Sequence, residues 1–195
     1  MRVMSKLIVC GALLAAGPAL AQQTADEIAF ATGLFGDAAQ GQVHRACYVR
    51  VYDAAHLKAH PIQKVTDIRI ILSARPLTAA EKKGSDEAPA EESLWRWRYA
   101  VHAILRNGSV RERATTTPCT PGVDEKGTLH MRCNAACDTG DEVRLKDGGR
   151  AITFGIAQED LADKKYDPHD DKAKPVDDNY FRLERAPMEQ CAFSP

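Results

Sequence analysis

The stretch LWRWRYAVHAILRNGSVRERATTT (94–117) decides the fold. Large apolar side chains recur at alternate positions from Trp95 to Leu105, and a period of two over this length is typical of a β-strand with one buried face. Asn107-Gly108 follows directly, and this dipeptide favours a tight hairpin turn because both residues tolerate a positive φ. The stretch therefore predicts a β-hairpin whose return strand covers residues 109–117.

The two turn residues also predict a register for this hairpin. With Arg106 opposite Ser109, His102 faces Arg113 and Glu112 falls on the apolar face, a local inconsistency that is typical of a β-bulge. The polar face then forms a basic patch, and we consider it a candidate surface for an anionic envelope component or an acidic protein. The alternative is a solvated outer face without a ligand. The expected patch consists of Arg96, Arg98, His102, Arg111 and Arg113.

Short segments with strand signals lie on both sides of the hairpin. They are rich in Val, Ile, Tyr and Phe and are separated by turns that contain Gly, Pro or Asp. The sequence therefore predicts an all-β protein: an antiparallel β-barrel or a two-sheet sandwich of about eight short strands, stapled by disulfides and preceded by a short N-terminal helix. The other expected strands cover residues 44–52, 65–73, 128–134, 141–146, 150–156 and 179–185.

The first 21 residues have the organisation of a secretory signal peptide. Arg2 and Lys6 precede an apolar run, and Ala19-Leu20-Ala21 provides a small-residue cleavage site before Gln22. We therefore expect a periplasmic or secreted protein. The expected organisation is a signal peptide (1–21), a helical or irregular segment (22–43) and a single β domain (44–195) with long polar loops at 76–93 and 157–178.

The composition argues against nucleic-acid binding and against a membrane span. The chain carries 26 Lys and Arg against 27 Asp and Glu, without the positive excess that attracts phosphate backbones. The N-terminal apolar run is broken by Gly17 and Pro18 and is shorter than the roughly 20 residues of a transmembrane helix. No nucleophile elbow or phosphate-binding loop occurs. The sequence therefore gives no positive evidence for an enzyme and implies no cofactor.

The cysteines indicate a disulfide framework. Of six cysteines, one lies in the signal peptide, and those of an exported protein are expected to be oxidised. Cys119 and Cys133 flank a loop that contains Pro and Gly, so we expect a bridge between them, worth roughly 3 kcal/mol in the chain-entropy model. Cys191 is expected to bond Cys47, with Cys137 as the alternative partner, because the first and last strands are neighbours in a closed barrel. Cys137 is then left as a free thiol, a mixed-disulfide site or a dimer bridge.

A weaker candidate site lies in YDAAHLKAHP (52–61). Spacings of three and four would put Asp53, His56 and His60 on one face of a helix, and imidazoles with a carboxylate suit zinc. The alternative function is therefore a metal-dependent enzyme or a metal-binding protein. Against it, Leu57 stands where a zincin has its glutamate, and Pro61 ends the helix, so a solvated surface turn is favoured.

These patterns favour an exported, small β-domain protein that acts by binding an envelope component or a protein partner, in the manner of an inhibitor. A structural envelope protein without a ligand is a further alternative. A filled barrel interior would leave only surface recognition, whereas an open interior would favour a small apolar ligand.

Overall fold

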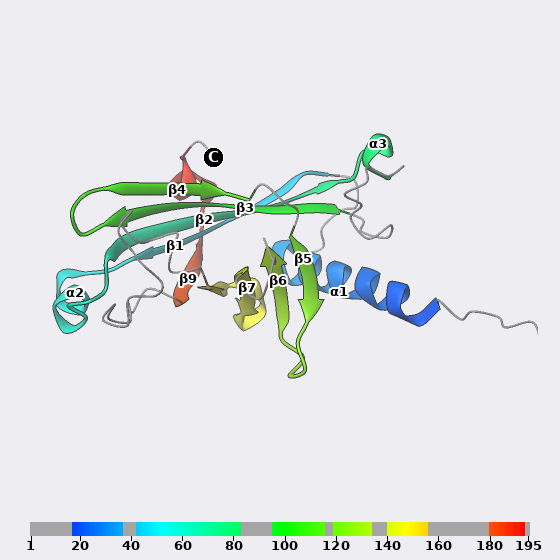
Figure 1. Cartoon of the computed structure of the whole chain (residues 1–195), viewed down its shortest axis with the longest axis horizontal. Helices are drawn as coiled ribbons and strands as arrows, with labels where there is room; N and C mark the ends of the chain where they lie inside the picture. The colour runs from blue at the N-terminus through cyan, green and yellow to red at the C-terminus, as the bar shows by residue number, and fades with distance from the viewer. Residues whose placement is uncertain are drawn as a thin grey trace, which may run out of the picture.

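Nine antiparallel strands form one continuous curled sheet in the computed structural model of the chain (Figure 1). The structure describes residues 17–36, 42–82, 95–115, 119–133, 140–155 and 180–193. The strands are β1 (His44–Val51), β2 (Val65–Pro76), β3 (Trp95–Leu105), β4 (Val110–Ala114), β5 (Thr120–Val123), β6 (Leu129–Cys133), β7 (Asp141–Lys146), β8 (Ala151–Gly155) and β9 (Tyr180–Ala186). The helices are α1 (Gly17–Phe35), α2 (Ala54–Ala59) and α3 (Ala79–Lys82), with 3₁₀ turns η1 (Asp147–Gly149) and η2 (Met188–Cys191).

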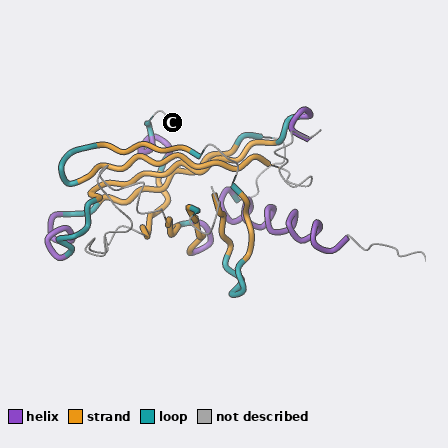
Figure 2. Tube along the Cα trace, in the orientation of Figure 1, coloured by secondary structure: helices purple, strands orange, loops and turns teal. Residues whose placement is uncertain are grey.

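The sheet consists of two meanders that β9 joins. Its strand order is β4-β3-β2-β1-β9-β8-β7-β6-β5, and β9 pairs with β1 on one side and with β8 on the other. β1–β4 form an extended layer, in which β2 and β3 are the longest strands, and β5–β8 lie beneath it together with α1 (Figures 1 and 2). The expected all-β class, with a short N-terminal helix and disulfides, is confirmed. The architecture is a single curled half-barrel.

The two edges of the sheet meet at one point. β4 and β5 are the edge strands and are consecutive in the chain, and the backbone N–H of Cys119 donates to the carbonyl of Trp97 over 3.1 Å in an isolated bridge. β5 is a strand that the sequence analysis did not predict, because its sequence TPGV contains Pro121 and Gly122. Proline is tolerated in an edge strand, where one side of the backbone needs no partner.

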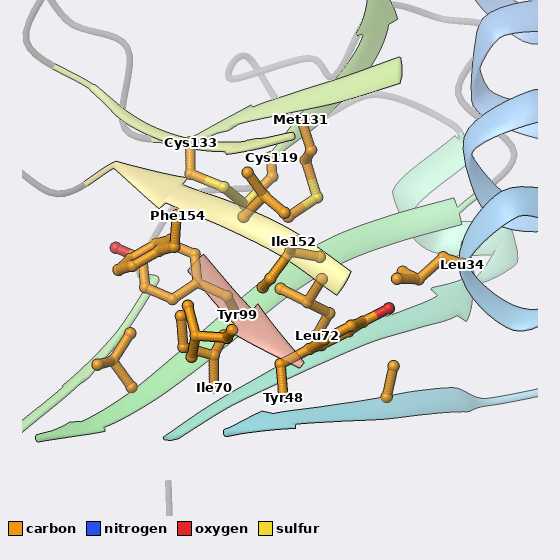
Figure 3. Packing of buried hydrophobic residues seen from close by; sticks show 14 of the residues in the cluster. Leu34, Tyr48, Ile70, Leu72, Tyr99, Cys119, Met131, Cys133, Ile152 and Phe154 are labelled. Atoms are coloured by element: carbon orange, nitrogen blue, oxygen red, sulfur yellow. A yellow bond between two sulfur atoms is a disulfide. The ribbon is translucent and has the colours of Figure 1, made fainter. Parts of the chain in front are cut away.

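The inner face of the curled sheet is filled by large side chains. The alternating apolar residues of β3 point inward as predicted, and Trp97 and Tyr99 are fully buried. Tyr99 lies edge-on to Phe154 of β8, with ring centroids 5.4 Å apart, and both rings point into the cluster in Figure 3. From α1, Phe30 meets Trp97 in the same edge-on geometry at 5.3 Å. One core therefore spans both meanders and the helix.

A buried carboxylate fixes α1 against β3. Glu27 is only 2% exposed, and its Oε1 accepts hydrogen bonds from Nε1 of Trp97 (2.8 Å) and from the backbone N–H of Trp95 (3.2 Å). Hydrogen-bonding both donors offsets the cost of burying the carboxylate.

None of the helices in the described residues is long and apolar enough to cross a membrane.

Both expected disulfides are present. Cys119–Cys133 links the start of β5 to the end of β6, beside the point where the sheet edges meet. Cys47–Cys191 ties β1 to η2 and holds a second apolar cluster on the outer face, together with Ile71. The first and last strands are neighbours as expected, although they lie in the middle of the sheet. Cys137 and the expected loop at 157–178 lie outside the described residues, as do residues 83–93 of the loop expected at 76–93.

The predicted register of the β3–β4 hairpin is wrong by one residue. The N–H of Leu105 bonds the carbonyl of Ser109, and the N–H of Gly108 bonds the carbonyl of Leu105, both at 2.9 Å. The loop therefore contains three residues, and Gly108 alone takes a positive φ, of 79°. This is the three-residue hairpin with a bulge at its glycine. Asn107 does not take a positive φ, and its Oδ1 instead accepts the N–H of Ser109 at 3.0 Å.

The shifted register moves the charges of β4 to different faces. His102 pairs with Glu112, and Val101 pairs with Arg113, so Glu112 lies on the outer face and its apparent inconsistency disappears. Arg111 and Arg113 lie on the inner side. The expected patch of five residues on one face is therefore wrong, because a slip of one residue exchanges the two faces of a strand. Arg96, Arg98 and His102 remain together on the outer face.

Candidate functional site on the outer face

Three polar residues lie side by side across the outer face of β1, β2 and β3. Arg45 pairs with Ser73, and Ser73 pairs with Arg98. Neighbouring strands are about 4.8 Å apart, so the two arginine Cα atoms are roughly 10 Å apart, with the serine between them. We call Arg45, Ser73 and Arg98 the arginine row.

The position of the arginine row follows from the alternation along each strand. Arg45 lies two residues before Cys47 in β1, and Ser73 lies two residues after Ile71 in β2. Both Cys47 and Ile71 belong to the outer cluster beneath η2. Arg45 and Arg98 are exposed, and Ser73 is half-buried. The hydroxyl of Ser73 is 3.5 Å from the carbonyl oxygen of Arg98, a long contact. This hydroxyl is therefore held only weakly by the protein.

A second pair of arginines, next to the row, is already neutralised. Arg75 and Arg96 are cross-strand partners, and both contact Oε1 of Glu81 in α3, at 2.6 and 3.0 Å. Glu81 also accepts the backbone N–H of Thr78, so it caps the short helix. The Arg75 guanidinium is the main cause that holds the pKa of Glu81 well below its usual range, followed by the Thr78 N–H. This ion-pair cluster belongs to the fold.

The two arginines of the row differ from the other described arginines in the contacts of their side chains. Every other arginine there makes a hydrogen bond, an ion pair or a ring contact. The side chains of Arg45 and Arg98 make no such contact with any described residue. The row is therefore a local positive charge that the described residues leave uncompensated.

The opposite end of the outer face carries balanced charge. Asp67 forms a 2.7 Å ion pair with Arg69, whose Nη1 also donates to the carbonyl of Gln190 over 2.8 Å. His102, a member of the expected patch, lies 2.9 Å from Glu112 through its Nδ1, and its ring lies against Phe193 at 5.3 Å. These contacts hold the C-terminal segment on the sheet.

The two remaining patch residues, Arg111 and Arg113, lie on the inner side of β4. Arg113 reaches inward and places Nη2 3.2 Å from Oδ2 of Asp141, which is only 1% exposed. The hydroxyl of Tyr99 donates to the same oxygen. Burial, followed by this hydrogen bond to Asp141, raises the pKa of Tyr99 well above its usual range. Arg111 donates to the carbonyl of Val110 at 3.3 Å. Neither arginine contributes to an outer basic surface.

The expected metal ligands are not arranged as a ligand set. Oδ1 of Asp53 accepts the backbone N–H of His56 at 2.7 Å and so caps α2. Nε2 of His56 lies 3.0 Å from Oε1 of Gln63, and its ring stacks on that of His60 at 4.3 Å. Within the described ranges, no group of three or more His, Cys, Asp or Glu side chains is placed to hold a metal ion. The three residues form a capped helical turn.

The side chain of Arg106 explains why that turn has its shape. From the β3–β4 loop, its guanidinium donates to the carbonyls of Leu57, His60 and Gln63 over 2.5 to 2.7 Å. These include carbonyls at the C-terminal end of α2, which have no partner within the helix. Arg106 therefore links the β1–β2 connection to the hairpin and has a structural role.

Of the arginine row, only Arg98 was predicted from the sequence as a site residue. Arg45 and Ser73 were not. Alternation could have assigned each to a face of its own strand. Their alignment, however, depends on the β1–β2 register, which follows a connection of 13 residues that contains α2. No local motif encodes that register.

Comparisons with known proteins provide no relative for this chain. No protein-family model matches the sequence, and no curated protein or solved structure shows a significant match. Any assignment of function therefore has to come from the geometry described above.

Proposed function

We propose that this chain is an exported, disulfide-stapled β-domain protein that acts by binding an anionic partner at the arginine row. The observation that carries the proposal is the uncompensated charge of Arg45 and Arg98, in a protein whose other described arginines all have a contact. The N-terminal sequence and the two disulfides support export to an oxidising compartment.

The charge of the row is local. The whole chain has a formal net charge of −1, so a general attraction to anions is not expected. An anionic group that approaches the row meets two exposed guanidinium groups, those of Arg45 and Arg98. Guanidinium groups bind carboxylate and phosphate oxygens through parallel hydrogen bonds. Binding of this kind is weakened by salt, because exposed charges are screened.

The filled interior supports recognition at the surface. Trp97, Tyr48 and Phe154 are fully buried on the inner face, and residues of both meanders and α1 pack into the same cluster. An apolar ligand inside the described part of the sheet would have to displace these side chains. The outer face is the surface on which charge is accessible without any rearrangement.

The test compares two double variants of equal charge in binding to two anionic probes, poly-L-glutamate and inorganic phosphate. Arg45→Ser with Arg98→Ser removes the row, and Arg132→Ser with Arg182→Ser removes two exposed arginines elsewhere. We expect the row variant to weaken binding by at least about tenfold, since hydrogen bonds to charged groups contribute about 1.5–3 kcal/mol, and to reduce its salt dependence. The control variant should bind like the wild type. Equal losses in both variants, or no binding of either probe by the wild type at low salt, would overturn the proposal.

A further inference from the structure

We infer that the group held at the arginine row is a phosphate monoester rather than a carboxylate, an inference that rests on the proposed function. The row presents donors from three neighbouring strands: a guanidinium on β1, a hydroxyl on β2 and a guanidinium on β3. The class of ligand can be inferred from how many of its oxygens can accept hydrogen bonds from these three donor groups at the same time.

A carboxylate has two oxygens in one plane, and a single guanidinium satisfies both in the bidentate pairing. The fold already contains such a pair, between Arg75 and Glu81, where Nη1 and Nη2 reach the two carboxylate oxygens at 2.8 and 2.6 Å. One arginine suffices for that pairing. A carboxylate at the row would leave the second guanidinium without a role.

A phosphate monoester has three terminal oxygens and a charge between −1.5 and −2 near pH 7. The three oxygens allow each of the three donor groups of the row, two guanidinium groups and one hydroxyl, to bond a different oxygen, and the charge matches the two positive charges of Arg45 and Arg98. The long, flexible side chains of these arginines extend from Cα atoms roughly 10 Å apart, so both can turn toward one group above Ser73. The hydroxyl of Ser73 is free to rotate toward it, since its own contact is 3.5 Å long.

The neighbouring ion pairs favour a single site rather than a broad basic surface. Arg75 and Arg96 are engaged by Glu81, and at the other end Arg69 is engaged by Asp67. A compact, doubly charged end group fits the available space and charge.

The experiment measures the affinities of the whole protein for inorganic phosphate and for acetate by isothermal titration calorimetry. We expect phosphate to bind at least about tenfold more tightly than acetate. Ser73→Ala should weaken phosphate binding by about fivefold, because one hydrogen bond is lost, and should leave the affinity for poly-L-glutamate unchanged. Ser109→Ala, which removes an exposed hydroxyl of the hairpin, is the matched control. Melting curves of both variants establish that the fold is retained.

The results separate the inference from the proposed function. Binding of poly-L-glutamate that depends on Arg45 and Arg98, combined with equal affinities for phosphate and acetate, would overturn the phosphate inference and leave the proposed function in place. Vesicles of phosphatidylcholine with and without phosphatidic acid identify the source of the phosphate. Capture by the phosphatidic acid vesicles that depends on the row supports a lipid monoester, and phosphate binding without capture supports a soluble ligand.

Discussion

Replacing Arg113 by serine should destabilise the protein far more than replacing Arg98, although both were expected on the same exposed face. Arg113 lies 3.2 Å from a carboxylate that is 1% exposed, and its own side chain is 30% exposed. Removing one partner of a fully buried ion pair costs about 3–5 kcal/mol. Solvent screens Arg113 in part, and Asp141 retains its hydrogen bond from Tyr99. We therefore expect a loss of about 2–3 kcal/mol.

The assay is thermal and urea unfolding of the wild type, Arg113→Ser and Arg98→Ser. For a domain of this size, about 1 kcal/mol shifts the melting temperature by 2–4 °C. Arg113→Ser should therefore lower it by about 5–10 °C, while Arg98→Ser should change the stability by less than about 0.5 kcal/mol. Adding Asp141→Asn should make the Arg113 replacement less costly, because the buried charge is gone. Equal effects of the two single variants, or full additivity in the double variant, would refute the inward orientation of Arg113.

Three further predictions concern the disulfides, the ionisation of Tyr99 and the turn at Gly148-Gly149. The Cys47–Cys191 bond spans 144 residues and the Cys119–Cys133 bond spans 14. Replacing the first pair by serines should therefore cost more, about 5 kcal/mol against about 3 in the chain-entropy model, and urea midpoints in the opposite order would contradict this. Burial raises the pKa of Tyr99 in the folded protein, so its contribution is complete below the unfolded tyrosine pKa of about 10 and is lost as the pH rises further. The free energy of unfolding should therefore fall above about pH 10, by up to about 1.4 kcal/mol per pH unit for this group. The fall should be less steep in Tyr99→Phe, and the same pH dependence in both proteins would exclude the effect. Gly148 and Gly149 both take positive φ, but a Cβ atom at Gly149 would lie 1.8 Å from the carbonyl oxygen of Gly33, whereas one at Gly148 meets nothing. The Gly149→Ala variant should therefore be much less stable than Gly148→Ala, which carries only the backbone strain of about 1–2 kcal/mol. Equal melting temperatures of the two variants would show that α1 is not packed against η1.

The class of the fold and the Cys119–Cys133 bridge could be predicted because their signals are local. Alternation along β3 identifies its buried face without knowledge of any neighbour. The Cys119–Cys133 bridge follows from a short loop that returns on itself. The Cys47–Cys191 bridge needed only the assumption that the first and last strands are neighbours, which holds even though the sheet is not the closed barrel that suggested it.

The candidate site could not be predicted because it depends on register. The Asn107-Gly108 dipeptide is compatible with both a two-residue and a three-residue loop, and the choice between them decides whether Arg111 and Arg113 lie outside or inside. The same limit applies between β1 and β2, where the pairing of Arg45 with Ser73 follows from the length of a distant connection. Alternation assigns side chains to faces within a strand but does not align one strand with another.

The central position of β9 has a consequence for the order in which the protein folds. Within each meander, every strand pairs with the strand next to it in sequence, so both meanders can form early from contacts of short separation. The joint between them needs residues 180–186, which are synthesised after the other eight strands of the described sheet. Until then β1 and β8 each present an unpaired backbone edge, the feature that promotes association between chains. A chain truncated before β9 should therefore aggregate rather than persist as a partly folded monomer.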